Sequence, residues 1–171
     1  MLFRSEQVLS IKKQNLRYED YGNKAIQDLF SSQSLDGAIK KEITVMYSCV
    51  AYNEGGGQFS VQVLPREVQW SSVNAIRLLD VNADGKDEII AGGNHFYFLP
   101  QFGRLDASFG HVLVQKERRS WEEMPYASSG LLLKGQVTDI QEVSVKGITH
   151  LLFLQNDDLP VFMRVSRSLK K

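Results

Sequence analysis

The chain of 171 residues is poor in the features that mark several large classes of protein. Its single cysteine, Cys49, excludes an internal disulfide and a cysteine-rich zinc site. Lys and Arg together number 20, and so do Asp and Glu, so no global charge attracts nucleic acid or an anionic membrane. No apolar run reaches the roughly 18 residues that a membrane-spanning helix needs. We therefore expect neither a nucleic-acid partner nor a membrane span.

Catalytic motifs are also missing. The histidines are not spaced from one another, or from a carboxylate, as metalloenzyme ligands usually are; they are His95, His111 and His150. The serine-containing segments 107–110 and 128–130 lack the G-x-S-x-G frame of a nucleophile elbow. The glycines at 55–57 are followed by neither a helix-like segment nor the Lys-[ST] pair of a phosphate loop. The sequence therefore predicts a protein that is not an enzyme.

One acidic stretch carries the strongest motif. Oxygen-bearing side chains alternate, then a glycine and a further acid follow, in the order Asp80, Asn82, Asp84, Gly85 and Glu88. Alternate side chains on a tight loop can surround a hard cation such as Ca²⁺ with oxygens. The helix–loop–helix calcium motif needs Glu at its twelfth position, where this chain has Ala91. The alternative is a turn rich in Asn, Asp and Gly without a metal, but crowded carboxylates repel one another unless a cation neutralises them.

The segments beside this loop have the pattern of strands. Residues 74–79 and 89–93 are short, apolar runs bounded by Ser, Asn or Gly. A strand, an acidic loop and a second strand form a hairpin whose turn is held by the ion. We therefore expect a β-hairpin calcium loop at residues 80–88.

Residues 80–92 resemble the FG-GAP/VCBS-type repeat, the calcium-loop hairpin of integrin-like β-propeller blades. The resemblance implies side-chain ligands and one backbone carbonyl, with the carbonyl from Lys86 and the side chains from Asp80, Asn82, Asp84 and Glu88. Four further segments, 64–76, 100–110, 130–137 and 154–160, resemble the C-terminal portion of large secreted bacterial repeat proteins, with motifs that are less specific than the calcium loop. The Phe-Gly pair of the repeat is absent before the loop, although Phe109-Gly110 follows it.

The expected fold is all-β, a partial β-propeller preceded by short N-terminal helices. Residues 1–40 form a helical lead-in with helix-like stretches at 6–18, 23–30 and 34–39. Residues 41–171 form the blade segment, with further strands expected at 42–52, 58–64, 95–99, 111–116, near Trp121, and at 130–140, 149–155 and 160–165. About ten strands at four per blade make about two to two and a half blades. Because isolated repeats rarely suffice, we expect exposed apolar faces where further blades dock.

The loop after the calcium hairpin is a candidate ligand site. It brings Tyr97, Phe102, Arg104 and Asp106 into one segment, and aromatic faces with a charged pair suit a sugar or a peptide. In the alternative interpretation, Phe96, Phe98 and Phe102 belong to the core, and Arg104 and Asp106 form a local brace that shapes the loop.

Two functions follow as expectations. The first is a non-catalytic, calcium-binding propeller segment of a secreted, periplasmic or cell-surface protein, a scaffold for adhesion or ligand binding. Its expected partners are the remaining blades of the parent protein and a surface glycan or protein. The second is an accessory domain of a secreted carbohydrate-active or other enzyme whose catalytic part is not in this chain. An intracellular structural protein is a third, weaker alternative. Residues 1–6 have neither a long apolar core nor a cleavage site, so we expect no signal peptide here.

Overall fold

A computed structural model describes residues 9–98 and 103–166 of the chain. It divides into two compact units, Met1–Val45 and Met46–Lys171. The first unit contains short helices: α2 (Leu9–Gln14), α3 (Tyr18–Gly22), α4 (Ile26–Leu29) and α5 (Ser32–Leu35). No helix among the described residues is long and apolar enough to cross a membrane.

The helices of the first unit are shorter than the sequence pattern predicts. Ile11 is buried, Leu29 and Phe30 are partly buried, and Leu16 and Ile26 are exposed, so the expected apolar faces are covered only in part. Each helix is one to two turns long, and so short a helix cannot present a continuous apolar stripe. Its ends depend on local contacts instead, such as the Ser31 hydroxyl that accepts from the Ser34 N–H at the start of α5.

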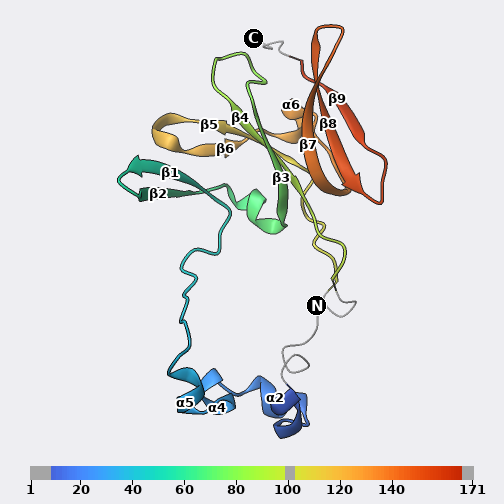
Figure 1. Cartoon of the computed structure of the whole chain (residues 1–171). Coiled ribbons are helices and arrows are strands. Elements are labelled where there is room, and N and C mark those ends of the chain that lie inside the picture. The colour runs from blue at the N-terminus through green and yellow to red at the C-terminus, as the bar shows by residue number, and fades with distance from the viewer. Residues whose placement is uncertain (1–8, 99–102, 167–171) are drawn as a thin grey trace. The chain divides into compact units, whose positions relative to one another are not determined.

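The second unit consists of three antiparallel sheets (Figure 1). The hairpin sheet has strands β1 (Cys49–Gly55) and β2 (Gln58–Val63). The middle sheet has β3 (Val73–Leu79), β4 (Glu88–Gly93), β5 (His111–Gln115) and β6 (Trp121–Glu123), paired in chain order. The C-terminal sheet has β7 (Gln136–Val145), β8 (Ile148–Asn156) and β9 (Val161–Arg164). Short helices connect them: η1 (Arg66–Trp70), η3 (Glu117–Arg119) and α6 (Tyr126–Ser129).

The middle sheet is buried on both faces at β4, every residue of which is buried, whereas Ile76 and Leu78 of the edge strand β3 are exposed. One face packs on the C-terminal sheet in a cluster that consists of Ala75, Leu79, Ile90, Val112, Leu131, Leu133, Val137, Ile140, Leu151 and Phe153. The other face contributes to a second cluster, made of Val68, Ile89, Ala91 and Leu113 with partly buried Val50, Leu64, Val73 and Trp121. Neighbouring residues such as Ile89 and Ile90 enter opposite clusters because side chains alternate along a strand.

The layers approach closely at Gly92 of β4. A Cβ atom at this position would lie 2.7 Å from Cγ1 of Val137 on β7, which is closer than van der Waals contact allows. Only glycine lets the backbone of the middle sheet come this near to the C-terminal sheet.

The predicted β-rich fold is confirmed, and the described strands form three separate sheets that do not close into a ring. Several strand boundaries were wrong. The strand predicted at 42–52 begins at Cys49, because β2 ends at Val63 and the chain then turns into η1. The strand predicted at 130–140 begins at Gln136, because Leu131 and Leu133 enter the core from irregular backbone. Within the predicted strand 95–99, His95 makes an isolated bridge with Leu105, and residue 99 lies outside the described residues.

The open end of the hairpin sheet is fastened by Gln69 of η1. Its side-chain oxygen accepts from the Ser48 N–H at 2.8 Å, and its Nε2 donates to the carbonyl oxygens of Ser48 and Leu64 at 3.0 and 3.1 Å. The Leu64 N–H also donates to the Ser48 carbonyl at 3.0 Å. One side chain therefore joins both chain ends of the hairpin to η1, the short helix that precedes the middle sheet.

Candidate functional site

The predicted calcium loop lies between β3 and β4. The Asp80 carboxylate accepts hydrogen bonds from the backbone N–H groups of Ala83 and Gly85, at 2.7 and 3.0 Å. Ala83 and Gly85 have φ angles of 63° and 84°, in the left-handed region that a tightly wrapped loop needs. Asp84 accepts from the Lys86 N–H at 2.8 Å. The loop is therefore wound around its own acidic side chains.

Glu88, the first residue of β4, lies beneath this loop and is 1% exposed. Its Oε2 accepts from the Val81 N–H at 2.9 Å. Burial raises the pKa of Glu88, and the negative charges of Asp84 and Asp80 raise it further, whereas the bond from Val81 lowers it. The raised pKa means that the charged form of the Glu88 carboxyl is disfavoured, because the groups around it supply too little positive charge to offset its burial.

The Asn82 amide joins two of the acids. Its Nδ2 donates to Oε1 of Glu88 at 2.9 Å and to Oδ2 of Asp84 at 3.1 Å, while its Oδ1 accepts from the Asp84 N–H at 2.8 Å. The NH₂ group thus supplies the partial positive charge between two carboxylates. Rotating the amide would turn Oδ1 toward the same point, as cation ligation by Asn82 requires.

The oxygens of the loop fit a hard cation by their chemistry. The four side chains named above are carboxylates and an amide, which are the ligands that Ca²⁺ prefers. Each carboxylate oxygen has a second lone pair beyond the hydrogen bond that it accepts. Within residues 9–98 and 103–166, however, no three acidic, histidine or cysteine side chains converge closely enough to hold an ion. Metal binding therefore requires Asn82 to turn and the carboxylates to draw together.

The candidate ligand loop divides its residues among separate contacts. The Tyr97 hydroxyl donates to the Asp157 carboxylate, and this bond raises the pKa of Tyr97. The Arg104 guanidinium lies 3.9 Å above the ring of Phe96. Asp106 is exposed, and Phe102 lies outside the described residues. Arg104 thus contacts Phe96, whereas the brace interpretation gave it Asp106 as a partner.

A buried chain of hydrogen bonds links a serine, a histidine and a glutamate, and the sequence pattern did not reveal it. Nε2 of His111 lies 3.0 Å from the Ser108 hydroxyl, and Nδ1 lies 2.8 Å from Oε1 of Glu123. These distances are those of a nucleophile, a base and an orienting acid. Ser108 is only 3% exposed and His111 2%, so a substrate has no access to the hydroxyl in this conformation.

Asn94 holds the serine in place. Asn94 Nδ2 donates to the Ser108 carbonyl, and its Oδ1 accepts from the Ser108 N–H. The polar chain therefore joins the loop before β5 to β5 and β6, which is a structural use. The Ser-x-x-His spacing was readable, but Glu123 reaches His111 only through the pairing of β5 with β6.

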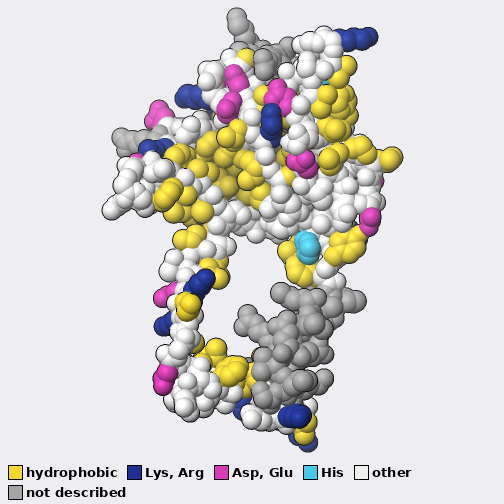
Figure 2. All heavy atoms as spheres, viewed as in Figure 1, with side chains coloured by type: hydrophobic (Ala, Val, Ile, Leu, Met, Phe, Trp, Pro, Cys, Tyr) yellow, Lys and Arg dark blue, Asp and Glu magenta, His cyan; other side chains and the backbone are white. Residues whose placement is uncertain are grey.

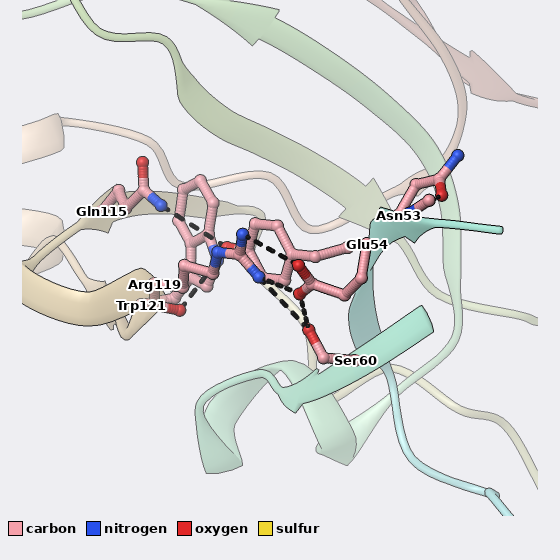
Figure 3. Close-up of polar contacts among 8 residues, drawn as sticks. Asn53, Glu54, Ser60, Gln115, Arg119 and Trp121 are labelled. Atoms are coloured by element: carbon pink, nitrogen blue, oxygen red, sulfur yellow. Dashed lines mark hydrogen bonds and ion pairs between the residues drawn. The ribbon is translucent and has the colours of Figure 1, made fainter. Parts of the chain in front are cut away.

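A second polar network attaches the hairpin sheet to the middle sheet. The Tyr52 hydroxyl accepts from Nε1 of Trp121 at 2.8 Å, and the Arg119 guanidinium lies 4.5 Å from the centre of the Tyr52 ring. Figure 3 shows Arg119 directed toward Glu54 and Ser60, with which it forms an ion pair and a hydrogen bond. The hydrogen bonds from Arg119 and Ser60 lower the pKa of Glu54.

This ion pair predicts a pH-dependent attachment of the hairpin sheet. Because the pKa of Glu54 is lower in the folded protein, its contribution is complete above the ordinary value of 4.5 and is lost as the pH falls through the folded pKa. We expect amide hydrogen exchange, corrected for intrinsic rates, to show β1 and β2 opening more readily at pH 3 than at pH 6. Glu54→Gln should remove the difference in these strands and leave the pH response of β8 unchanged. An equal response in wild type and variant would contradict the assignment.

A cleft of about 680 Å³ opens between the middle and C-terminal sheets. Its wall includes Ile90 and Leu151 from facing sheets, and it reaches Val81 and Asn82 of the acidic loop. Asn82 of the loop therefore forms part of the wall of a space that is lined by both polar and apolar side chains.

Comparisons with protein-family models, with curated proteins and with solved structures found no match to this chain. The resemblance to the FG-GAP/VCBS repeat consequently stays a prediction from its sequence motif.

Proposed function

We propose that this chain is a non-catalytic, calcium-binding segment of an FG-GAP/VCBS-type β-propeller, a scaffold for adhesion or ligand binding in a secreted or cell-surface protein. The observation that carries the proposal is the loop of residues 80–88. It holds Asp80 and Asp84 by backbone N–H groups and places Glu88 beneath them, buried and short of positive charge. Calcium bound by these oxygens would fix the turn between β3 and β4.

The arrangement of the sheets supports the propeller. A blade is an antiparallel meander of four strands, which is the topology of the middle sheet. The hairpin sheet precedes it with two strands and the C-terminal sheet follows it with three. The two strands of the hairpin sheet correspond to the end of one blade, and the four strands of the middle sheet to a whole blade. The three strands of the C-terminal sheet correspond to the start of a third blade. Strands β4 and β5 of the middle sheet are packed on both faces, as the strands of an internal repeat are.

The burial of Ser108 and His111 supports a non-catalytic role. A nucleophile needs a substrate carbonyl within reach of its hydroxyl. Here the hydroxyl accepts from the Gly110 N–H at 3.2 Å, and its backbone is fixed by Asn94.

Calcium titration of the full chain tests the proposal. After treatment with a chelator, we expect added Ca²⁺ to raise Tm, with a gain of about 2.7 kcal/mol in unfolding free energy at 100 times Kd. Asp84→Ala should abolish the gain. Asp87→Ala, at an exposed position beside the predicted ligands, is the matched control and should keep it. Absence of any Tm increase in wild type at millimolar Ca²⁺ would refute calcium binding.

A further inference from the structure

A groove of about 560 Å³ lies between the end of the hairpin sheet and β6, the last strand of the middle sheet. One wall contains Val63 and Leu64, where β2 ends, and Glu67 of η1, while the other consists of residues 121–126. Figure 1 shows β6 on the side of the middle sheet that is nearer to the hairpin sheet. Figure 2 shows hydrophobic side chains gathered on this face of the second unit, over the two sheets. The groove shares no residue with the acidic loop and has a volume typical of ligand sites.

The lining of the groove is acidic. Among the described residues it contains no Lys, Arg or His but three carboxylates, those of Glu67, Glu122 and Glu123. Glu67 forms no ion pair within residues 9–98 and 103–166, and the adjacent Arg66 lies over the ring of Trp70 instead. Glu122 lies 3.8 Å from Nζ of Lys116, in an exposed pair that contributes little. The groove therefore offers more negative charge than its surroundings neutralise.

Carboxylates from both walls act on Tyr126, which is 37% exposed. Burial raises the pKa of Tyr126, the negative charge of Glu123 and a hydrogen bond to it raise this pKa further, and so does the charge of Glu67. Glu123 keeps its Oε2 for a further contact, since Oε1 is bonded to His111. Trp121 adds a second aromatic ring to the same groove. Carboxylates beside aromatic rings attract an organic cation, through their charge and through the faces of the rings.

The same groove exposes an unpaired strand edge. β6 pairs with β5 alone, and the Met124 N–H donates toward β5, to the Val112 carbonyl at 2.7 Å. Because the backbone groups of alternate residues point to opposite sides of an antiparallel strand, those of Trp121 and Glu123 point away from β5. Side chains of neighbouring residues lie on opposite faces of a sheet, yet residues 121–124 all line the groove, so the groove follows this edge. Unpaired N–H and C=O groups on a strand edge are a template for another strand.

We propose that the groove binds an extended, basic segment of another polypeptide, which pairs with the free edge of β6 and places a Lys or Arg side chain between Glu67 and Glu123. Main-chain hydrogen bonds to Trp121 and Glu123 supply affinity, and the carboxylates select the basic side chain. The apolar walls at Val63 and Met124 cover the aliphatic stem of that side chain. A metal ion fits less well, because no three acidic, histidine or cysteine side chains of the described residues converge to hold one. This site is independent of calcium binding by the acidic loop.

Calorimetric titration of the full chain at low salt tests this site with a capped peptide, acetyl-Thr-Val-Thr-Lys-Thr-Val-Thr-amide. We expect binding, and hydrogen exchange followed by NMR should show the amides of Trp121 and Glu123 becoming protected when the peptide is added. The same peptide with Glu in place of Lys should bind about tenfold more weakly, because it brings a like charge to the carboxylates. The lysine peptide with every Val and Thr N-methylated should not bind, since it lacks the main-chain donors.

Substitutions at Glu67 test the charge selection. Glu67→Gln should weaken binding of the lysine peptide about fivefold and keep the thermal transition of wild type. Glu67→Lys should reduce the preference for the lysine peptide over the glutamate peptide still further. Glu117→Gln, at an exposed position outside the groove, is the matched control and should bind the lysine peptide as wild type does.

Each contrary result overturns a stated part of the proposal. No heat of binding at millimolar lysine peptide, with unchanged exchange at Trp121 and Glu123, refutes the site. Equal affinities of the lysine and glutamate peptides refute the charge selection, and equal losses in Glu67→Gln and Glu117→Gln place the selective charge elsewhere. Undiminished binding of the N-methylated peptide would mean a site for a cationic group alone, without strand pairing.

Discussion

Glu88→Gln should stabilise the protein at pH 7 in the presence of a chelator and should also abolish its stabilisation by calcium. The carboxyl is buried beneath two other acids, and its pKa is raised in the folded state. A group of this kind stabilises the fold below its unfolded pKa and loses that contribution as the pH rises through the folded pKa. As the pH rises above the unfolded pKa, the charge on Glu88 therefore costs stability unless a cation is bound. Glutamine removes the charge and leaves one neutral amide oxygen in place of the carboxylate, so a bound cation loses a charged ligand.

Urea denaturation with chelator and with saturating Ca²⁺ measures both effects. Wild type should gain about 2.7 kcal/mol at 100 times Kd, and Glu88→Gln should gain nothing at the same Ca²⁺ concentration. Asp87→Asn is the control for a loss of charge beside the loop, because Asp87 is exposed and outside the ligand set. A less stable Glu88→Gln protein in chelator would contradict the electrostatic explanation. A full calcium effect in this variant would remove Glu88 from the ligand set.

His111→Ala should lower the free energy of unfolding by about 3 kcal/mol, since removing one partner of a buried polar pair leaves the other without compensation. The substitution removes the bond to the Glu123 carboxylate and the contact with the Ser108 hydroxyl. Both groups lie where water has little access. The polar chain joins β5, β6 and the preceding loop, so the loss affects the middle sheet as a whole.

His150→Ala is the matched control, because His150 lies on the outer side of β8 and stacks on the exposed ring of Phe162. Equilibrium denaturation of dilute samples should show a loss of less than about 1 kcal/mol for this variant. Equal losses for the two histidines would mean that the chain through Ser108 and Glu123 contributes nothing specific.

The acidic hairpin was the part of the fold most accessible from sequence. The strands predicted at 74–79 and 89–93 are confirmed as β3 and β4, with boundaries one residue away at most. The information was local, since alternating acids, a glycine and two apolar runs all lie within 21 residues. Calcium binding by this loop stays a prediction, as does the repeat family.

The contacts that depend on tertiary structure were not predictable in the same way. Residues 42–47 alternate like a strand, but β2 ends before it could pair with them, so local pattern alone extended β1 too far. His111 and Glu123 are twelve residues apart, and only the register of β5 with β6 brings them together. A pattern reports which residues favour a strand, whereas pairing and burial depend on distant segments.

Gln69 gives the hairpin sheet a defined response to mechanical force. The two ends of the hairpin lie side by side, because the Leu64 N–H is bonded to the Ser48 carbonyl. Tension between the segment before Ser48 and the middle sheet would therefore unzip β1 from β2 one bond at a time, instead of shearing all the bonds together. Gln69 lies at the point where that unzipping begins and bonds to both ends. Its side chain thus sets the force at which the hairpin starts to yield.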